Sequence, residues 1–272
     1  METNLSNSSG PFHQMGNEIR SLYKYRYLVG ELVLKNIKNR YKRSILGVAW
    51  TMINPLLTML VLTIVFSQLF ANNLPRYPVY LLSGLLMWNF FSQTTVSAIR
   101  DLVWSSTLLK RIYIPKGLFA TAAVGTGLVN LLLALVPLGI IAIVTGSRLG
   151  LPILFLPVAL LIASLFSLGV GLGISTQAVF FGDVVEMYQI VLVAWMYLTP
   201  IFYPIEILSP KLRLFIYLNP LYYIVECFRD PIYLNKFPSV HVILIAVISA
   251  LFAAILGGWV FARKSNEFAY YI

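Results

Sequence analysis

Charged residues are scarce in this chain of 272 residues: 11% are Asp, Glu, Lys or Arg, whereas a typical soluble domain has about 25%. The chain is 59% hydrophobic with a mean hydropathy of +0.81, so it cannot cover a water-facing surface. The lipid bilayer is the solvent that accepts such a surface. The composition therefore excludes an ordinary soluble domain and indicates a membrane protein.

Cysteine and histidine are also scarce. The single Cys227 excludes an intrachain disulfide, and the two histidines, His13 and His241, stand far apart in the sequence. Of the ten acidic residues, Asp183 and Glu186 approach each other at helical spacing near the end of an apolar run. We therefore expect no metal site, and no chain of ionisable groups that would relay protons through the membrane.

The sequence contains no phosphate-binding loop of the form GxxxxGK followed by Ser or Thr. Its most glycine-rich stretch, GVGLGIS at 169–175, has no lysine after it and lies in an apolar run, where small residues favour close helix packing. We expect no catalytic residues and no cofactor in this chain. If the protein moves a substrate against its concentration gradient, the energy must come from a partner.

Long apolar runs are the main feature that is present. A helix needs about 20 apolar residues to cross the hydrocarbon core, and six runs meet or approach that length. The predicted fold is an all-α integral membrane protein with six transmembrane helices, at about 45–70, 77–99, 117–147, 152–181, 184–205 and 240–262. The connections are short, so residues 45–272 are expected to form one membrane domain.

The stretch at 206–238 has a different pattern. Its apolar part, residues 214–225, is too short to span, and Asn219–Pro220 interrupts it where proline removes a backbone donor. We expect a re-entrant pair of short helices here, between spans 5 and 6, that enters the membrane and returns. Such irregular backbone must be shielded by protein or line a wet cavity.

Lysine and arginine are distributed unevenly between the connections. Eight precede span 1, four lie between spans 2 and 3, and two follow span 6, whereas the connections of the opposite side hold six. Cytoplasmic loops carry the excess of these cations. Both termini are therefore predicted to be cytoplasmic.

Much of the +10 net charge lies near the N-terminus. Residues 1–19 are polar, contain no apolar signal sequence and are expected to be a disordered leader. In residues 20–44, apolar side chains recur every three or four positions with most cations opposite, which predicts an amphipathic helix on the cytoplasmic membrane surface. Its membrane-surface anchors are Lys38, Arg40, Lys42 and Arg43. This charge favours membrane lipid, not nucleic acid, as the partner.

Aromatic side chains are frequent in the spans and in the re-entrant stretch. They are typical of membrane interfaces and of ordinary packing, but aromatic faces that stack on sugars or slide along lipid chains also suit a translocation path. The candidate path residues are Trp88, Phe90, Phe91, Trp195, Tyr197, Tyr203, Tyr217, Tyr222 and Tyr223. Pro55 in span 1 also has a functional and an ordinary interpretation. Its bend widens a pore between two copies of the chain, or it is a kink that serves only helix packing.

Several motifs together resemble a known family. RYKRSILGVAWTMINPLL resembles the start of the first span in ABC-2 type permeases that export bacterial polysaccharides, and MWNFFS resembles their second span. LLKRIYIP, YLTPIFYP and NPLYYIVECFRD resemble the segments that follow span 2, end span 5 and form the re-entrant stretch. The matches run in family order over residues 30–230. One departure is Gly182, since the family often has arginine before the acidic residue that is Asp183 here.

The resemblance implies the membrane subunit of an ATP-driven exporter in the bacterial cell membrane. It implies a homodimer with a channel at its interface and two copies of a separate nucleotide-binding subunit, which bind ATP and Mg²⁺. The implied substrates are lipid-linked glycans of O-antigen, capsule or teichoic-acid type. It also assigns the connection between spans 2 and 3 as a cytoplasmic coupling helix, whose contacts to the ATPase are Asp101, Trp104, Leu108, Leu109, Lys110 and Arg111.

Other interpretations stay open beside this one. The apolar face formed by Trp104, Leu108 and Leu109 needs a protein partner or a lipid surface to cover it. An ABC-2 exporter of a drug or a lipid would share the six spans, although the aromatic second span and the broken stretch favour a glycan. A membrane-embedded glycosyltransferase would need clustered carboxylates and basic groups, for which Asp183 and Glu186 are too few.

Overall fold

The computed structural model describes residues 24–42, 44–70, 74–104 and 115–268, together with residues 16, 20 and 21. Side chains are described for all of these except residues 41, 68–70, 104 and 266. Every regular element in the described part is helical, which confirms the predicted all-α class. Four segments there are long and apolar enough to cross a membrane: Gly47–Ser67, Gly117–Val144, Leu151–Phe180 and Val240–Lys264.

Long and short helices alternate along the chain. The long ones are α3 (Trp50–Phe70), α4 (Tyr77–Trp104), α6 (Gly117–Val144), α7 (Leu156–Phe180) and α11 (Val240–Lys264). The shorter ones are α2 (Arg26–Tyr41), α8 (Val184–Tyr197), α9 (Pro210–Tyr217) and α10 (Pro220–Arg229). Single turns are η1 (Gly47–Ala49), η2 (Leu151–Phe155), η3 (Ile205–Ile207), η4 (Asp230–Leu234, a π-helical turn) and η5 (Ser265–Glu267).

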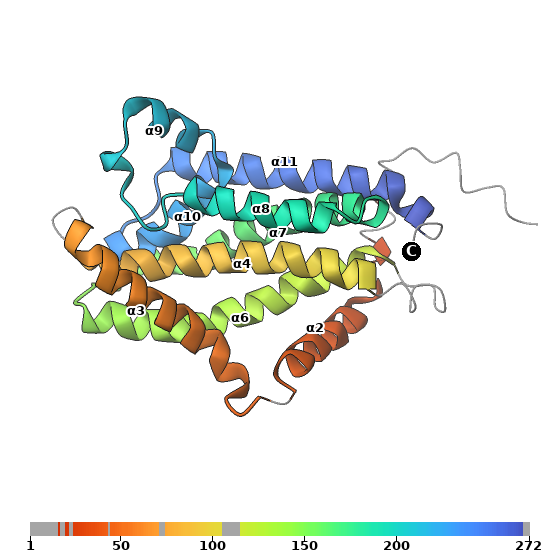
Figure 1. The fold of residues 1–272 in the computed structure, drawn as a ribbon, viewed down its shortest axis with the longest axis horizontal. Helices are drawn as coiled ribbons and strands as arrows, with labels where there is room; N and C mark the ends of the chain where they lie inside the picture. Colours follow the sequence, from red (N-terminus) through yellow and green to blue (C-terminus); the bar gives the residue numbers. More distant parts are fainter. Residues whose placement is uncertain are drawn as a thin grey trace, which may run out of the picture.

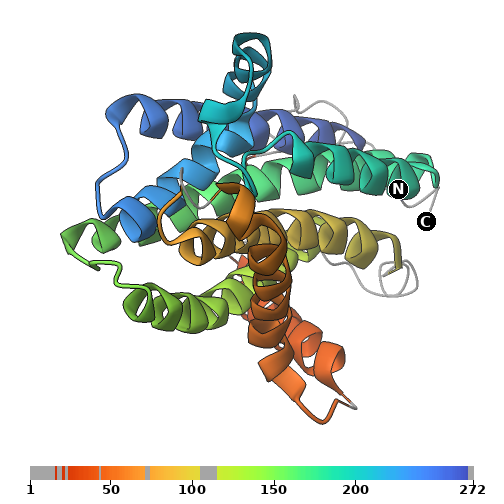
Figure 2. The same ribbon diagram turned by 60° about the vertical axis from the view of Figure 1, so that its left-hand side comes forward.

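The helices form a bundle with two projections. Helices α4, α7, α8 and α11 run along its long axis, as Figure 1 shows. Helices α2 and α3 project from one side of the bundle and α9 projects from the opposite side, in both Figure 1 and Figure 2. The N-terminal half of α3 therefore stands away from the bundle, while the helix still packs against α4 and α6.

Helix α4 forms the centre of the bundle. It packs against α3, α6, α7, α8 and α10, and nearly every side chain from Tyr77 to Phe91 is buried. With 28 residues it exceeds the length needed to cross the hydrocarbon core, about 20 residues. Because neighbouring helices rather than lipid surround it, α4 tolerates polar side chains such as Ser83 and Thr95, and this explains why it is less apolar than its neighbours.

Helices α7 and α11 cross at very close range. A Cβ atom placed on Gly257 would lie 1.9 Å from the carbonyl oxygen of Gly169, and one on Gly169 would lie 2.4 Å from the carbonyl oxygen of Ala253. Only glycine fits at such a backbone approach. The interpretation of the glycine-rich stretch at 169–175 as a packing surface is confirmed at Gly169.

The range 184–205, predicted as one span, contains a shorter helix. Helix α8 has 14 residues and rises about 21 Å. It ends at Tyr197, because Pro200 and Pro204 lack the backbone donors that a continuing helix needs. Residues 198–204 instead form a turn that folds against α4, and the two short helices α9 and α10 follow it where the re-entrant pair was expected.

Helix α2 forms part of the predicted amphipathic helix at 20–44. Most of its apolar side chains, including Val33, are half-buried, and the helix packs against α6, while Tyr27 and Leu34 are exposed together with Lys35 and Lys38. At the same end of the bundle, Lys116 Nζ donates a hydrogen bond to the carbonyl oxygen of Ser265, which joins the start of α6 to the end of α11. Of the predicted leader, residues 1–15 and 17–19 lie outside the described residues.

Candidate functional site

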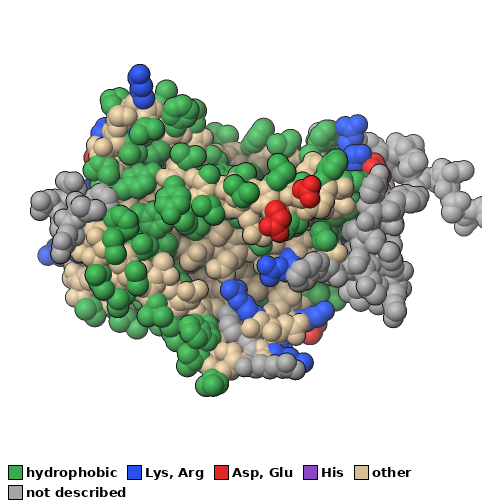
Figure 3. Space-filling view, in the orientation of Figure 1, with side chains coloured by type: hydrophobic (Ala, Val, Ile, Leu, Met, Phe, Trp, Pro, Cys, Tyr) green, Lys and Arg blue, Asp and Glu red, His purple; other side chains and the backbone are tan. Residues whose placement is uncertain are grey.

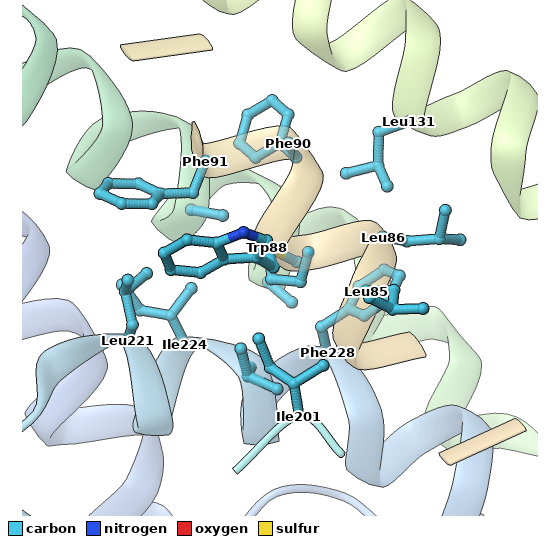
Figure 4. Packing of buried hydrophobic residues seen from close by; sticks show 14 of the residues in the cluster. Leu85, Leu86, Trp88, Phe90, Phe91, Leu131, Ile201, Leu221, Ile224 and Phe228 are labelled. Atoms are coloured by element: carbon cyan, nitrogen blue, oxygen red, sulfur yellow. The ribbon is translucent and has the colours of Figure 1, made fainter. Parts of the chain in front are cut away.

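An aromatic cluster occupies the middle of the bundle. Phe91 of α4 lies 5.9 Å from Trp88, 5.6 Å from Phe166 of α7 and 5.2 Å from Trp195 of α8, measured between ring centroids. Trp88 and Phe91 are buried, and Figure 4 shows Trp88 pointing toward Leu221 on α10. Three predicted path residues thus converge from two helices, in the interior of the bundle.

The other predicted path residues lie elsewhere. Phe90 points to the opposite side of α4 from Trp88, toward Leu131 of α6 (Figure 4). Tyr197 and Tyr217 are exposed, whereas Tyr203 is half-buried and its hydroxyl donates to the carbonyl oxygen of Tyr197 at 2.7 Å.

Tyr217, Tyr222 and Tyr223 form a second aromatic group at the junction of α9 and α10. The Tyr222 ring lies 5.9 Å from that of Tyr217 and 5.0 Å from that of Tyr223. The Tyr223 hydroxyl donates to the carbonyl oxygen of Tyr217 at 2.9 Å. The nine aromatics therefore form the cluster around Phe91, the group at the junction of α9 and α10, the Tyr197–Tyr203 pair and Phe90 alone. Their role in a path stays a prediction.

Asn219 joins the α9–α10 pair to α8. Its side-chain oxygen accepts from Trp195 Nε1 at 2.8 Å and from the backbone N–H of Leu221 at 3.0 Å. Its amide nitrogen donates to the carbonyl oxygen of Leu198 and to the Thr199 hydroxyl. Asn219 is therefore the N-cap of α10, with proline in the first helical position. The sequence analysis identified the break here, and the Asn-Pro pair was the available signal for the cap.

Arg229 is the last residue of α10, and its side chain is almost completely buried. Its Nη1 donates to the carbonyl oxygen of Pro200 at 3.0 Å and to Glu226 Oε1 at 2.9 Å. The guanidinium carbon lies 3.9 Å from the centroid of the Tyr80 ring, a cation–π contact. A Cβ on Gly84 would lie 2.4 Å from Nη2, so glycine makes room for it. Sequence reasoning counted this residue only as a loop cation, and no local signal indicated its burial.

Tyrosine hydroxyls fasten the turn at 198–204 to α4. Tyr77 donates to the carbonyl oxygen of Phe202 at 2.8 Å, and Tyr80 donates to those of Pro200 and Tyr203. Backbone groups in hydrocarbon have no water to pair with, so irregular backbone needs such partners. Backbone carbonyl groups of the turn that ends α8 thereby have hydrogen-bond partners within the protein.

At the end of the bundle that carries α2, two side-chain contacts join α2 to α4. Asn36 Nδ2 donates to Asp101 Oδ2, and Arg40 Nη2 donates to Gln93 Oε1, both at 3.1 Å. Burial raises the pKa of the Asp101 carboxyl above its usual range, against the opposing effect of the Asn36 hydrogen bond. Asp101, predicted to contact an ATPase, is thus bonded within its own chain.

The remaining predicted contacts fall partly outside the described part of the chain. Lys38, Arg40 and Lys42 are exposed, as surface anchors would be. Outside the described residues are Arg43, the side chain of Trp104, and Leu108, Leu109, Lys110 and Arg111. No group of three or more His, Cys, Asp or Glu side chains that could hold a metal ion occurs among the described residues.

A polar cavity of about 340 Å³ lies between α2, α3, α4 and α6. Half of its lining side chains are polar, and they come from all four helices and from the connection after α2: Arg40, Ser44, Thr51, Asn54, Asn89, Gln93 and Asn130. Trp50, Pro55, Leu86, Phe90 and Leu131 are among its apolar walls. Figure 3 shows the hollow beside the projecting α2 and α3, with basic side chains at its edge. Sequence reasoning missed this site, because its amide side chains come from separate segments of the chain, and only Asn89 and Gln93 among them stand at helical spacing within one helix.

A family model described as ABC-2 type transporter matches residues 27–233. The O-antigen export system permease protein RfbA of Myxococcus xanthus is 28% identical to this chain over 256 residues, which cover 92% of this chain and 97% of the relative. The protein of the same name from Klebsiella pneumoniae is 25% identical, over 92% and 98% of the two chains. The capsule polysaccharide export inner-membrane protein CtrC of Neisseria meningitidis serogroup A is 23% identical, over 78% and 81%.

The bundle of apolar helices and the family match together define a multi-pass membrane subunit of a transporter, not an enzyme. The chain belongs to the ABC-2 type transporter family. This confirms the resemblance seen in the sequence motifs, and family membership implies a partner that binds ATP.

Proposed function

We propose that this protein is the membrane subunit of an ABC exporter that moves a lipid-linked polysaccharide outward from the cytoplasmic side. The observation that carries the proposal is the similarity of nearly the whole chain to permeases named for O-antigen and capsule export. The polar, aromatic-walled cavity supports it, because amide side chains suit the hydroxyl groups of a sugar and aromatic walls suit its ring faces.

The proposal includes six spans, with α4 and α8 added to the four apolar segments. The length of α4 supports this assignment, and its protein surroundings account for its polar residues. Helix α8 falls short of a full crossing by itself, and the turn at 198–204 with the α9–α10 pair completes the outer half as a re-entrant segment. Both termini are cytoplasmic in this proposal, as the excess of fourteen cations over six supports.

We further infer that the channel forms between two copies of the chain. Helix α8 supports this inference, since Met187, Ile190 and Val193 leave a row of exposed apolar side chains beside the exposed Tyr197. In the dimer, Tyr197 and Tyr217 face the passing glycan, while the buried cluster around Phe91 supports the wall from behind. Two nucleotide-binding subunits, which hold ATP and Mg²⁺, dock on the connection between α4 and α6.

The function is tested in cells that lack the gene for this chain. We expect such cells to lose surface polysaccharide and to accumulate lipid-linked glycan inside, and the intact chain to restore export. The variant Tyr197→Ala/Tyr203→Ala/Tyr217→Ala should restore assembly with the ATPase but little export, whereas Phe252→Ala, an equally exposed aromatic change on α11, should restore both. Unchanged surface polysaccharide in the deletion strain would exclude this function. Full export by the triple variant would exclude only the aromatic path.

A further inference from the structure

The polar cavity between α2, α3, α4 and α6 contains more hydrogen-bonding capacity than packing requires. Four amide side chains from three helices line it: Asn54 of α3, Asn89 and Gln93 of α4, and Asn130 of α6. Polar residues inside a membrane are unfavourable and are typically functional. Amides spread over three helices contribute nothing to apolar packing, so their convergence indicates a polar ligand.

Asn130 is the residue whose hydrogen bonding points most directly to a polar ligand. It lies near the middle of α6, within one of the four apolar segments. Its side-chain oxygen is buried and accepts no hydrogen bond from any described residue. Hydrocarbon supplies no donor for such an oxygen, but a ligand hydroxyl in the cavity would.

The lining also indicates the chemistry of that ligand. An amide both donates and accepts hydrogen bonds, as a sugar hydroxyl does. Trp50 and Phe90 provide aromatic walls, which suit the flat faces of a sugar ring. Arg40 lies toward the α2 end of the cavity and donates to Gln93 there. A guanidinium group matches a phosphate by its geometry and charge, and none of the described residues that line the cavity is acidic.

We propose that this cavity binds the glycosyl phosphate headgroup of a lipid-linked saccharide, with the phosphate at Arg40 and the first sugar among the amides. The volume of about 340 Å³ lies at the lower end of the range for small-molecule sites, about 300–1,000 Å³. The lipid tail remains in the bilayer beside α3, where Leu57, Leu60 and Val61 are exposed. This inference rests on the proposed function for its substrate class, and it assigns the place where that substrate is first held.

The test measures binding, without export, on the purified full chain in lipid nanodiscs. Thr51 lines the cavity, so Thr51→Cys places a thiol in its wall, while the native Cys227 is buried. The probe is dodecyl glucosyl phosphate, compared with dodecyl phosphate and dodecyl glucoside as its two halves. At a probe concentration about ten times its Kd, about a tenth of the sites stay free, so alkylation of residue 51 should slow about tenfold. A thiol at the exposed position 209 should react at an unchanged rate.

Two substitutions test the assigned contacts. Asn130→Leu removes the amide at similar volume, and Arg40→Gln removes the charge; each should raise the probe concentration needed for protection about tenfold or more. The matched control Arg263→Gln changes an exposed arginine on α11 and should leave protection unchanged. Equal thermal stability of the variants shows that the fold is retained.

The possible outcomes separate the ligand classes. Protection by the complete probe, but only weakly by either half, supports the proposal. Equal protection by dodecyl phosphate would assign the cavity to an anionic lipid headgroup. Equal protection by dodecyl glucoside would show that Arg40 does not bind a phosphate. Either result overturns the glycosyl phosphate assignment. Failure of protection together with normal export in cells would refute this site and leave the proposed function intact.

Discussion

Arg229 places a charge where water is absent, and its surroundings show how the chain accommodates it. The side chain is held by Glu226, the carbonyl oxygen of Pro200 and the face of the Tyr80 ring, and Gly84 leaves the space it fills. Its contacts join α10 to α4 and to the turn after α8. A buried charge is tolerated only when it is paired and hydrogen-bonded. The stability of this region therefore depends on Arg229 and its partners being present together.

Replacing Arg229 alone should therefore strongly destabilise the protein. Arg229→Met leaves Glu226 without its partner, and we expect a loss of roughly 3–5 kcal/mol of stability. The double variant Arg229→Met/Glu226→Gln should recover part of that loss, because Glu226 is then no longer an unpaired charge. Thermal unfolding of the purified protein in detergent measures both, with Arg148→Gln, an exposed arginine, as the control. A single variant as stable as the control would show that the pair contributes nothing.

Between elements, the closest contact is the crossing of α7 and α11. The two helices touch backbone to backbone at Gly169 and Gly257. Without a hydrophobic driving force between helices in lipid, such close packing is a main source of association. The position of α11 in the bundle therefore depends on these two glycines.

Gly257→Ala should destabilise the bundle, because the added methyl group meets the carbonyl of Gly169 and forces the helices apart. An overpacked core typically loses about 1–3 kcal/mol. Gly139→Ala on α6 is the matched control, since a Cβ there has no neighbour within 4 Å, and it should leave stability unchanged or raise it. Comparing the melting temperatures of the two variants checks the prediction, which fails if the two temperatures are equal.

At the scale of the whole molecule, the surface divides into an apolar belt and a charged end. Figure 3 shows hydrophobic side chains over much of the visible face. Charged groups lie over α2 and near the ends of α8 and α11, with a few basic ones on the projecting α9. The proposed orientation places this charged end in the cytoplasm, where an excess of lysine and arginine is expected. The α9–α10 pair then belongs to the outer half.

Cysteine labelling in intact cells tests this orientation. Ser209→Cys, at the exposed start of α9, should react with a membrane-impermeant thiol reagent, whereas Gly182→Cys, exposed before α8, should react only after the cells are permeabilised. The buried Cys227 should give little background. Labelling of residue 182 and not of residue 209 would mean that the chain is inserted the other way round.

Composition and spacing by themselves determined a membrane protein built from helices, the approximate ranges of those helices and the family. They succeeded because hydropathy, helix length and proline act locally along the chain. The break at Asn219–Pro220 is an example: proline disrupts a helix wherever it stands, so two short helices could be expected from the sequence.

Only the tertiary structure brought together Asn54, Asn89, Gln93 and Asn130 in one cavity, and only it buried Arg229 against Tyr80. Helical spacing along the sequence links only Asn89 with Gln93, and Arg229 with Glu226. It does not link the residues of different helices. Which faces of α3, α4 and α6 meet depends on the crossing and rotation of whole helices, which follow from packing of many side chains at once. For that reason only the tertiary structure reveals the polar site, whereas the sequence alone indicates the membrane location and the helices.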